Sequence, residues 1–236
     1  MYAPHQRSLV SKKDPGPKEA NRFFHLLTIN TIPLIFKKEE HRGQIPTDSN
    51  IYRSNMKKAI VIYYSNTGSN RYLAEKIADR LECDIEEIKP RPNLFPVLML
   101  LSALKASWGI KSLKHNLEEY DRIILCGPIW MGKLISPLRG FINRYRACFK
   151  QLYFVTCCGS GDAVKNDKFG HATVFKLVRE ILGDTCVLCE AFPIGLVLPE
   201  EKQKDGDAIM KTRLSDTNFS GDIQKRFDNF IKKISG

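Results

Sequence analysis

Four apolar runs and one weaker, mixed run recur along the chain from residue 59 onward, and turn-forming residues bound most of them. Continuous apolar runs of this length are typical of strands that are buried on both faces of a sheet. The pattern therefore predicts strands at residues 59–64, 83–88, 122–127, 152–158 and 186–192, of which the second is the least apolar.

Between these runs, apolar residues recur at intervals of three and four positions, which is the spacing of amphipathic helices. This spacing predicts helices at residues 70–81, 136–146, 171–184 and 220–234. Strands that alternate with helices form a parallel sheet whose two faces are both covered. Because such sheets bind ligands beyond the carboxyl ends of their strands, the loops after the first, third and fourth strands form the candidate site.

The first loop follows residues 59–64 and opens a helix. It consists of Ser65, Asn66, Thr67, Gly68, Ser69 and Asn70. Amides at a helix N-terminus have no partner within the helix and attract anions, and the hydroxyls of Ser65, Thr67 and Ser69 add further donors. The loop contains no Lys or Arg, so neutral groups would hold a phosphate there. A capped turn without a ligand is the alternative interpretation.

The second loop is the sequence GPIWMGK after the third strand, and the third loop is CCGSGD after the fourth. The candidate ligand contacts are Pro128, Ile129, Trp130, Met131 and Gly132 in the second loop and Gly159, Ser160, Gly161 and Asp162 in the third. Small residues leave the backbone open to a ligand, and a Trp offers a flat face. The alternatives are a hydrophobic plug at Trp130 and a plain turn in the third loop.

From about Lys58 to its C-terminus, the chain resembles the flavodoxin-like family. YSNTGSN is similar to the phosphate loop of that family, and GPIWMGKLISPLRGFI to its flavin-bordering loop with the helix that follows. CCGSGD lies where the family has its second flavin-facing loop. The resemblance implies a flavodoxin-like doubly wound α/β fold, with a five-stranded parallel sheet in the order 2-1-3-4-5 and helices on both faces.

The resemblance also implies FMN as the cofactor. Its phosphate would lie on the amides of residues 66–70, and its ring between the second and third loops with Trp130 as the stacking partner. The family position that Asn70 occupies is usually Thr, and Asn70 still offers a donor. The backbone of Met131 and Gly132 would contact the N5 edge of the ring. The third loop lacks the Tyr that the family often places there, which would leave one face of the ring open.

The function that this resemblance implies is redox chemistry. One reading is an FMN-dependent oxidoreductase that passes electrons from a reduced nicotinamide or a protein donor to a quinone-like or other acceptor. The other is an electron carrier between redox proteins, and a flavin-free interaction module is a third. The net charge of +11 and the position of Lys133 favour a higher flavin potential and the reductase. The sequence identifies no catalytic residue.

The cysteines and the charge limit the partners and the location. Seven cysteines without the spacing of a disulfide framework predict a reducing cytoplasm. Nucleic acid is not an expected partner, because no basic cluster is interleaved with aromatic residues. CVLC at residues 186–189 has metal-like spacing but no second matching pair. Its thiols are expected to pack as small apolar groups, on a strand whose alternate positions face opposite sides, without a metal.

Two further segments stand apart from the predicted sheet. Residues 1–55 combine polar stretches with an apolar run, and we expect a poorly ordered extension before a domain at 56–236, with Met56 as the natural start. A signal peptide or anchor is the alternative, although no small-residue cleavage site follows the run. Residues 94–110 are apolar but too short to span a membrane, and predict a buried or dimer-facing helix. A helix on a membrane surface is the alternative.

Overall fold

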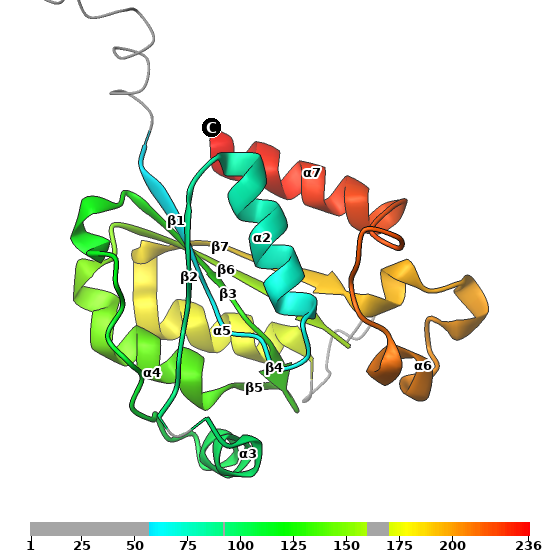
Figure 1. Cartoon of the computed structure of the whole chain (residues 1–236), viewed down its shortest axis with the longest axis horizontal. Helices are drawn as coiled ribbons and strands as arrows, with labels where there is room; N and C mark the ends of the chain where they lie inside the picture. The colour runs from blue at the N-terminus through cyan, green and yellow to red at the C-terminus, as the bar shows by residue number, and fades with distance from the viewer. Residues whose placement is uncertain (1–56, 92, 160–169) are drawn as a thin grey trace, which may run out of the picture. The chain divides into compact units, whose positions relative to one another are not determined.

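A central parallel sheet organises the computed structural model, which describes residues 57–91, 93–159 and 170–236 (Figure 1). Its strands are β1 (Ala59–Tyr63), β2 (Asp84–Glu87), β3 (Arg122–Cys126), β6 (Gln151–Cys158) and β7 (Cys186–Pro193). They lie in the order β2-β1-β3-β6-β7, and all neighbours are parallel. This order confirms the predicted flavodoxin-like α/β fold. The domain boundary near residue 56 stays a prediction, because residues 1–56 lie outside the described part.

Helices cover both faces of the sheet (Figure 1). α4 (Ser136–Tyr145) and α5 (His171–Leu182) cover one face, whereas α2 (Ser69–Leu81) and α7 (Asp222–Ser235) cover the other. Alternate residues of β1 belong to the two resulting cores, Ile60 and Ile62 to the first and Val61 to the second. All three are fully buried. Burial of such a side chain contributes about 1.5–3 kcal/mol, so β1 anchors both layers.

A short hairpin interrupts the connection from β3 to α4. It pairs β4 (Ile129–Trp130) with β5 (Lys133–Leu134) in antiparallel fashion, and the sequence did not predict it. Met131 and Gly132 form the two-residue turn with φ angles of +50° and +66°. Two left-handed residues match the twist of the strands, and Asn-Gly is the usual choice for such a turn. Met131 instead places a long side chain in this conformation, where it is 66 % exposed.

α3 (Phe95–Ala103) occupies only part of the predicted helix at 94–110. One face is buried through Leu98 and Ser102, but Phe95 and Leu100 are 47 % and 61 % exposed. The prediction of a buried helix is therefore correct for one face alone, and the continuation of the helix to residue 110 is wrong. In the described part of the chain, none of the helices is both long and apolar enough to cross a bilayer.

The segment after α3 covers the outer edge of β2. The amide of Lys111 donates to the carbonyl of Lys89 at 2.8 Å, and that of Arg91 to Gly109 at 2.9 Å. These backbone bonds lie just beyond the end of β2. An uncovered strand edge invites pairing with other chains, and this segment lies across that side of the sheet. The backbone oxygen of Trp108 would lie 2.3 Å from a Cβ at position 140, and this close approach requires the glycine there.

Short helices complete the described chain. The segment after β7 contains α6 (Gly206–Lys211), which the sequence did not predict; the side chain of Asp205 caps it by accepting from the amides of Asp207 and Ala208. The 3-10 turns are η1 (Leu117–Glu119), η2 (Arg146–Cys148), η3 (Gly183–Thr185), η4 (Ile194–Val197) and η5 (Glu200–Lys202).

Candidate functional site

The register of the sheet brings the three predicted loops to one edge. Tyr63 at the end of β1 pairs with Cys126 at the end of β3, and Cys126 pairs with Val155 of β6. The amide of Gly127 continues the ladder by donating to the carbonyl of Val155 at 3.0 Å. The first, second and third loops therefore leave neighbouring strands at the same edge, which is where ligands of this kind of sheet bind.

The first loop keeps several donors open. The amide of Gly68 donates to Ser65 Oγ at 3.1 Å, and the carbonyl of Gly68 accepts the first bond of α2, from Tyr72. The amides of Ser69, Asn70 and Arg71 lie in the first turn of α2 and have no hydrogen-bond acceptor among the described residues. Gly68 has φ of +103°, and a Cβ built on it meets nothing within 4 Å. Open amides and open space together make a cradle for an anion.

Asn70 has a different role from the one predicted for its side chain. It is 5 % exposed, its Nδ2 donates to the carbonyl of Cys157 at 3.1 Å, and its Oδ1 accepts from the amide of Cys157 at 2.8 Å. The side-chain amide thus ties the first loop to the end of β6. Only the backbone N–H of Asn70 remains for a ligand.

The hydroxyls of the first loop divide in the same way. Ser69 is buried, and its Oγ accepts a hydrogen bond from the amide of Leu214 at 3.2 Å. Thr67 is exposed and Ser65 half-buried. Of the three predicted hydroxyl donors, those of Ser65 and Thr67 lie at the surface of the loop.

A second helix begins at this edge of the sheet, but its N-terminus is closed. The amide of Ser136, the first residue of α4, donates to Ser102 Oγ at 2.8 Å, and the next residue, Pro137, has no N–H. Ser102 Oγ in turn donates to the carbonyl of Leu98 at 2.6 Å. The start of α4 therefore offers an anion far fewer donors than the start of α2.

The second loop packs against α3. The rings of Trp130 and Phe95 meet edge to face with centroids 5.2 Å apart, and Trp130 is half-buried. Lys133 Nζ donates to the carbonyl of Ala103 at 3.0 Å. Packing against α3 is the plug role that the sequence left open for Trp130. Stacking on a ring by Trp130, with contacts from Pro128, Ile129, Met131 and Gly132, stays a prediction.

The third loop is described only to Gly159, so the predicted contacts at Ser160, Gly161 and Asp162 lie outside the described residues. A Cβ on Gly159 would lie 3.1 Å from the side chain of Ile209 on α6, so a larger residue there would press on that side chain. Burial raises the pKa of the Cys157 thiol, and the neighbouring Cys158 raises it further. The thiol of Cys157 is therefore neutral, and the backbone amide and carbonyl of this residue are the groups that bond to Asn70.

Sequence reasoning missed a cation beside the first loop. Arg213 is close enough to Cys157 to act electrostatically on its thiol, and the next residue, Leu214, bonds to Ser69. The guanidinium donates to the carbonyls of Met210 and Thr212, both at 2.7 Å, which fixes it on the segment after α6. No local signal marks Arg213, because it comes from a polar stretch far along the chain from the first loop.

A basic pocket of about 260 Å³ lies beside the second loop. Its charged lining consists of Lys105, Lys133, Arg139, Lys176 and Glu180. Arg139 Nε is buried without a hydrogen-bond partner among the described residues, and burial lowers the pKa of this guanidinium. Glu180 pairs with Lys176 at 3.9 Å, so the pocket has an excess of positive charge from Lys105, Lys133 and Arg139 next to Gly132, which also lines it.

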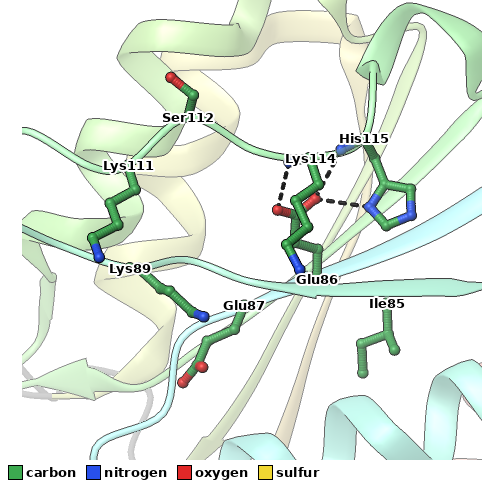
Figure 2. Close-up of a pocket in the computed structure, with 8 residues that line it drawn as sticks. All are labelled: Ile85, Glu86, Glu87, Lys89, Lys111, Ser112, Lys114 and His115. Atoms are coloured by element: carbon green, nitrogen blue, oxygen red, sulfur yellow. Dashed lines mark hydrogen bonds and ion pairs between the residues drawn. The ribbon is translucent and has the colours of Figure 1, made fainter.

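A larger pocket, of about 350 Å³, lies at the edge of β2, and we call it the edge pocket (Figure 2). It is lined by Ile85, Glu86, Glu87, Lys89, Lys111, Ser112, Lys114 and His115. Figure 2 shows Glu86 bonded to the covering segment: its carboxylate accepts from the amides of Lys114 at 2.7 Å and His115 at 3.1 Å, and lies 2.8 Å from His115 Nδ1. The polar groups of the edge pocket thus hold the segment at residues 111–115 against β2.

Comparison with solved structures finds flavoproteins and flavodoxins whose sequence identity to this chain is low. No family model matches the chain, and no curated protein matches it. A flavoprotein in complex with FMN from Lactobacillus acidophilus NCFM is 16 % identical, with a TM-score of 0.47, over 57 % of this chain and 93 % of that one. A Fusobacterium nucleatum flavodoxin bound to flavin mononucleotide is 10 % identical, with a TM-score of 0.40, over 76 % and 97 %. The Streptococcus pneumonia TIGR4 flavodoxin is 14 % identical, with a TM-score of 0.38, over 75 % and 96 %. At such similarity, the ligand must be argued from the residues of this chain.

Proposed function

We propose that the protein binds FMN at the edge of the sheet where the three loops meet and acts as a redox protein. The open amides at the start of α2, beside the left-handed Gly68, carry this proposal. They suit a dianionic phosphate, which needs several donors and a close backbone approach. The flavin supplies the redox chemistry when bound, and the chain supplies its seat and its electrostatic environment.

The residues of this chain divide the binding between them. The open amides of Ser69, Asn70 and Arg71, with those of residues 66 and 67 and the hydroxyls of Ser65 and Thr67, would hold the phosphate. The amide of Gly68 already donates to Ser65 Oγ. Arg213 adds a positive charge near the loop, which neutral groups alone do not supply. The second loop, with Trp130 and the exposed Met131–Gly132 turn, would border the ring.

A comparison of FMN with riboflavin tests the phosphate site directly. Riboflavin has the same ring but no phosphate, so we expect it to bind at least about a hundredfold more weakly, given charge-assisted hydrogen bonds of about 1.5–3 kcal/mol each. The measurement is titration of flavin-free protein by fluorescence quenching. Equal affinity for the two flavins would mean that the first loop is only a capped turn.

The basic pocket favours an oxidoreductase over an electron carrier. Positive charge near the ring stabilises an anionic reduced flavin and raises its potential, and Lys133 and Arg139 supply that charge locally. The proposed reaction takes electrons from a reduced nicotinamide or a protein donor to a quinone-like acceptor. Anaerobic reduction by NADH or NADPH in a single two-electron step, followed by quinone turnover, is the expected result. Reduction in two separate one-electron steps without quinone turnover would favour the carrier.

Partners beyond the redox donor and acceptor are proposed from α3. Its outward face exposes Phe95 and Leu100, and Leu104 follows at 68 % exposure. This apolar face suits a homodimer, which analytical ultracentrifugation of the full chain tests. Flotation with anionic vesicles tests the alternative of a membrane-surface contact. We also propose that the protein is cytoplasmic.

A further inference from the structure

The two cysteines of CVLC do not lie as they would in a regular strand. Cys186 pairs with Leu152 of β6, but Leu188 pairs with the very next residue, Tyr153, so Val187 is an extra residue in β7. A bulge of this kind shifts the alternation of side chains by one position. Cys186 and Cys189 consequently belong to the same core, and the expectation of opposite faces is wrong for this pair.

The bulge brings the two sulfur atoms into contact. Their Sγ atoms lie 3.5 Å apart, and both residues are free thiols. A disulfide needs about 2.05 Å between its sulfurs, so the two atoms must approach each other further to form the bond. Cys186 is the first residue of β7, at the end of the strand opposite to the loops of the proposed flavin site.

The surroundings distinguish Cys186 from other cysteines of the chain. A hydrogen bond from Cys189 lowers the pKa of Cys186, and the charge of Arg179 on α5 acts in the same direction against burial. Burial raises the pKa values of Cys83, Cys126 and Cys157. The thiolate is the nucleophilic form, which favours Cys186 as the attacking member of the pair and Cys189 as the resolving one.

We propose that Cys186 and Cys189 form a reversible redox-active dithiol that hydrogen peroxide oxidises to an intrachain disulfide. Both residues are less than a tenth exposed, 9 % and 7 %, so a reagent as small as peroxide fits the site better than a protein disulfide. A disulfide in a reducing compartment is typically transient, which suits a sensor. The proposal does not depend on flavin binding.

The chemistry balances in two steps. The Cys186 thiolate attacks one peroxide oxygen, an S–O bond forms, the O–O bond breaks, and hydroxide leaves and takes up a proton to become water. The Cys189 sulfur then attacks the sulfenic sulfur, the S–S bond forms, the S–O bond breaks, and a second water leaves with the Cys189 proton. Peroxide is reduced to two waters while the dithiol loses two electrons and two protons.

Mass spectrometry of the folded full-length protein tests this directly. Trypsin cleaves after Arg179 and Lys202, so both cysteines fall in one peptide, 180–202, with no other cysteine. After brief peroxide treatment and blocking of free thiols, we expect this peptide to be lighter by two hydrogen atoms than its reduced form, and to be restored by dithiothreitol. If both of its thiols are alkylated while Cys83 or Cys148 is already oxidised, the proposal is wrong.

Two variants separate the roles of the thiols. Cys189→Ser should leave the sulfenic acid on Cys186 unresolved, so that dimedone labels peptide 180–202 more than in the wild type. Cys186→Ser should abolish both disulfide and label. Equal dimedone labelling of wild type and Cys189→Ser would refute a resolving role for Cys189. Because circular dichroism checks folding, and the wild-type experiment needs no variant, a misfolded variant does not decide the outcome.

Discussion

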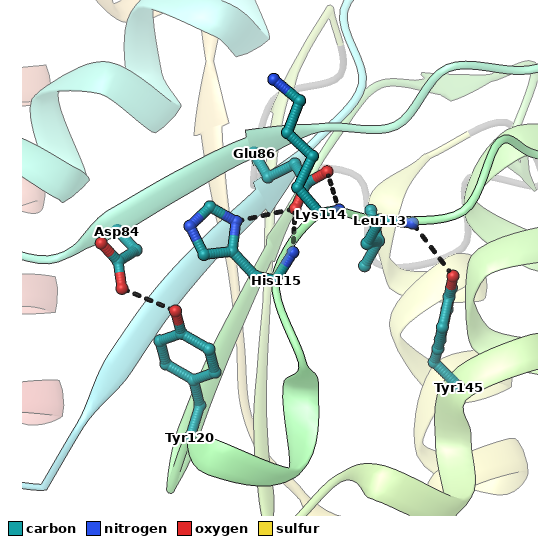
Figure 3. A network of polar contacts seen from close by, with 7 residues as sticks. All are labelled: Asp84, Glu86, Leu113, Lys114, His115, Tyr120 and Tyr145. Atoms are coloured by element: carbon teal, nitrogen blue, oxygen red, sulfur yellow. Dashed lines mark hydrogen bonds and ion pairs between the residues drawn. The ribbon is translucent and has the colours of Figure 1, made fainter.

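The first loop and the edge pocket are both polar concavities beside strands, yet they use their polar groups in opposite ways. In the edge pocket, Glu86 bonds to two amides and a histidine ring, and Tyr120 Oη donates to Asp84 Oδ2 at 2.6 Å nearby (Figure 3). In the first loop, the amides of Ser69, Asn70 and Arg71 find no acceptor among the described residues. The edge pocket is large, about 350 Å³, but its polar groups already have partners within the chain.

The difference shows how a polar pocket that stabilises the fold can be told apart from a candidate binding site. A buried polar group needs a partner, and in the edge pocket the chain itself supplies that partner. Around the first loop, the described part of the chain supplies partners to the groups that fix the loop, among them the side chains of Asn70 and Ser69 and the amide of Gly68. The donors left over are the ones that the proposed phosphate would use.

Replacement of Gly68 by valine should have the largest effect on binding. A β-branched residue at φ of +103° is strained, and its side chain would fill the open space of the cradle. We expect FMN affinity to fall by at least about a hundredfold, if two or more charge-assisted bonds of about 1.5–3 kcal/mol are lost.

Gly221→Val is the matched control for that experiment. Gly221 also precedes a helix with positive φ, +65°, and open space, but at α7. It should cost similar stability in urea unfolding and leave FMN binding unchanged. A Gly68→Val protein that titrates with FMN like the wild type would remove the distinction between the two regions.

Replacement of Asn70 by alanine tests the other half of the comparison. It leaves the amide and carbonyl of Cys157 without their buried partner, so we expect a loss of roughly 2–6 kcal/mol in the free energy of unfolding, at about 1–3 kcal/mol for each of the two orphaned groups. Threonine, the usual residue of the family at this position, is too short to bond to both groups. The stability of Asn70→Thr should therefore lie between those of the wild type and Asn70→Ala. Unchanged urea midpoints for both variants would show that Asn70 does not hold the loop.

Replacement of Glu86 by glutamine should loosen the edge pocket. Burial alone would raise the pKa of Glu86, but hydrogen bonds from Lys114 and His115 outweigh it, and the pKa lies below its usual range. The stability that this carboxylate contributes is present above its unfolded pKa, about 4.3, and is lost as pH falls through the lower folded pKa. We expect Glu86→Gln to cost about 1–2 kcal/mol at neutral pH, because its NH₂ replaces an acceptor.

The measurement is urea unfolding of wild type and variant across the acid range. The gap between them should shrink as the pH falls through the folded pKa of Glu86. Glu119→Gln removes a carboxylate from an exposed ion pair with Lys58 and should change stability little at any pH. A constant gap would mean that Glu86 does not titrate with folding.

Replacement of Met131 by glycine should have the smallest effect, and it should be stabilising. The change relieves a left-handed methionine whose side chain is 66 % exposed, so little packing is lost. We expect a gain of about 0.5–1 kcal/mol, or a rise in Tm of roughly 1–4 °C. Met210→Gly, at an equally exposed but helical position, should lower the Tm instead.

Much of the fold could be predicted from the sequence, because the apolar runs of strands and the spacing of helices are local patterns that can be recognised within each element. The strand order followed from the resemblance of two loop motifs. The bulge at Val187 could not be predicted, since it depends on how β7 pairs with β6. Likewise, only tertiary contacts bring the hydroxyl of Ser102 to the start of α4 and the backbone of Leu214, next to Arg213, to Ser69 of the first loop. Local pattern located the candidate loops, whereas the assignment of each donor within them required the structure.

The bond between Asn70 and Cys157 has a consequence for the order of folding. It joins residues 87 positions apart in sequence, and loop closure over such a distance is entropically costly. The first loop lies near the start of the folded domain. It nevertheless acquires its final shape only after β6 has added to β3, because Asn70 bonds to Cys157 of β6. During refolding, the ability to bind flavin should appear with the late, long-range contacts of the sheet and after the helical signal of α2.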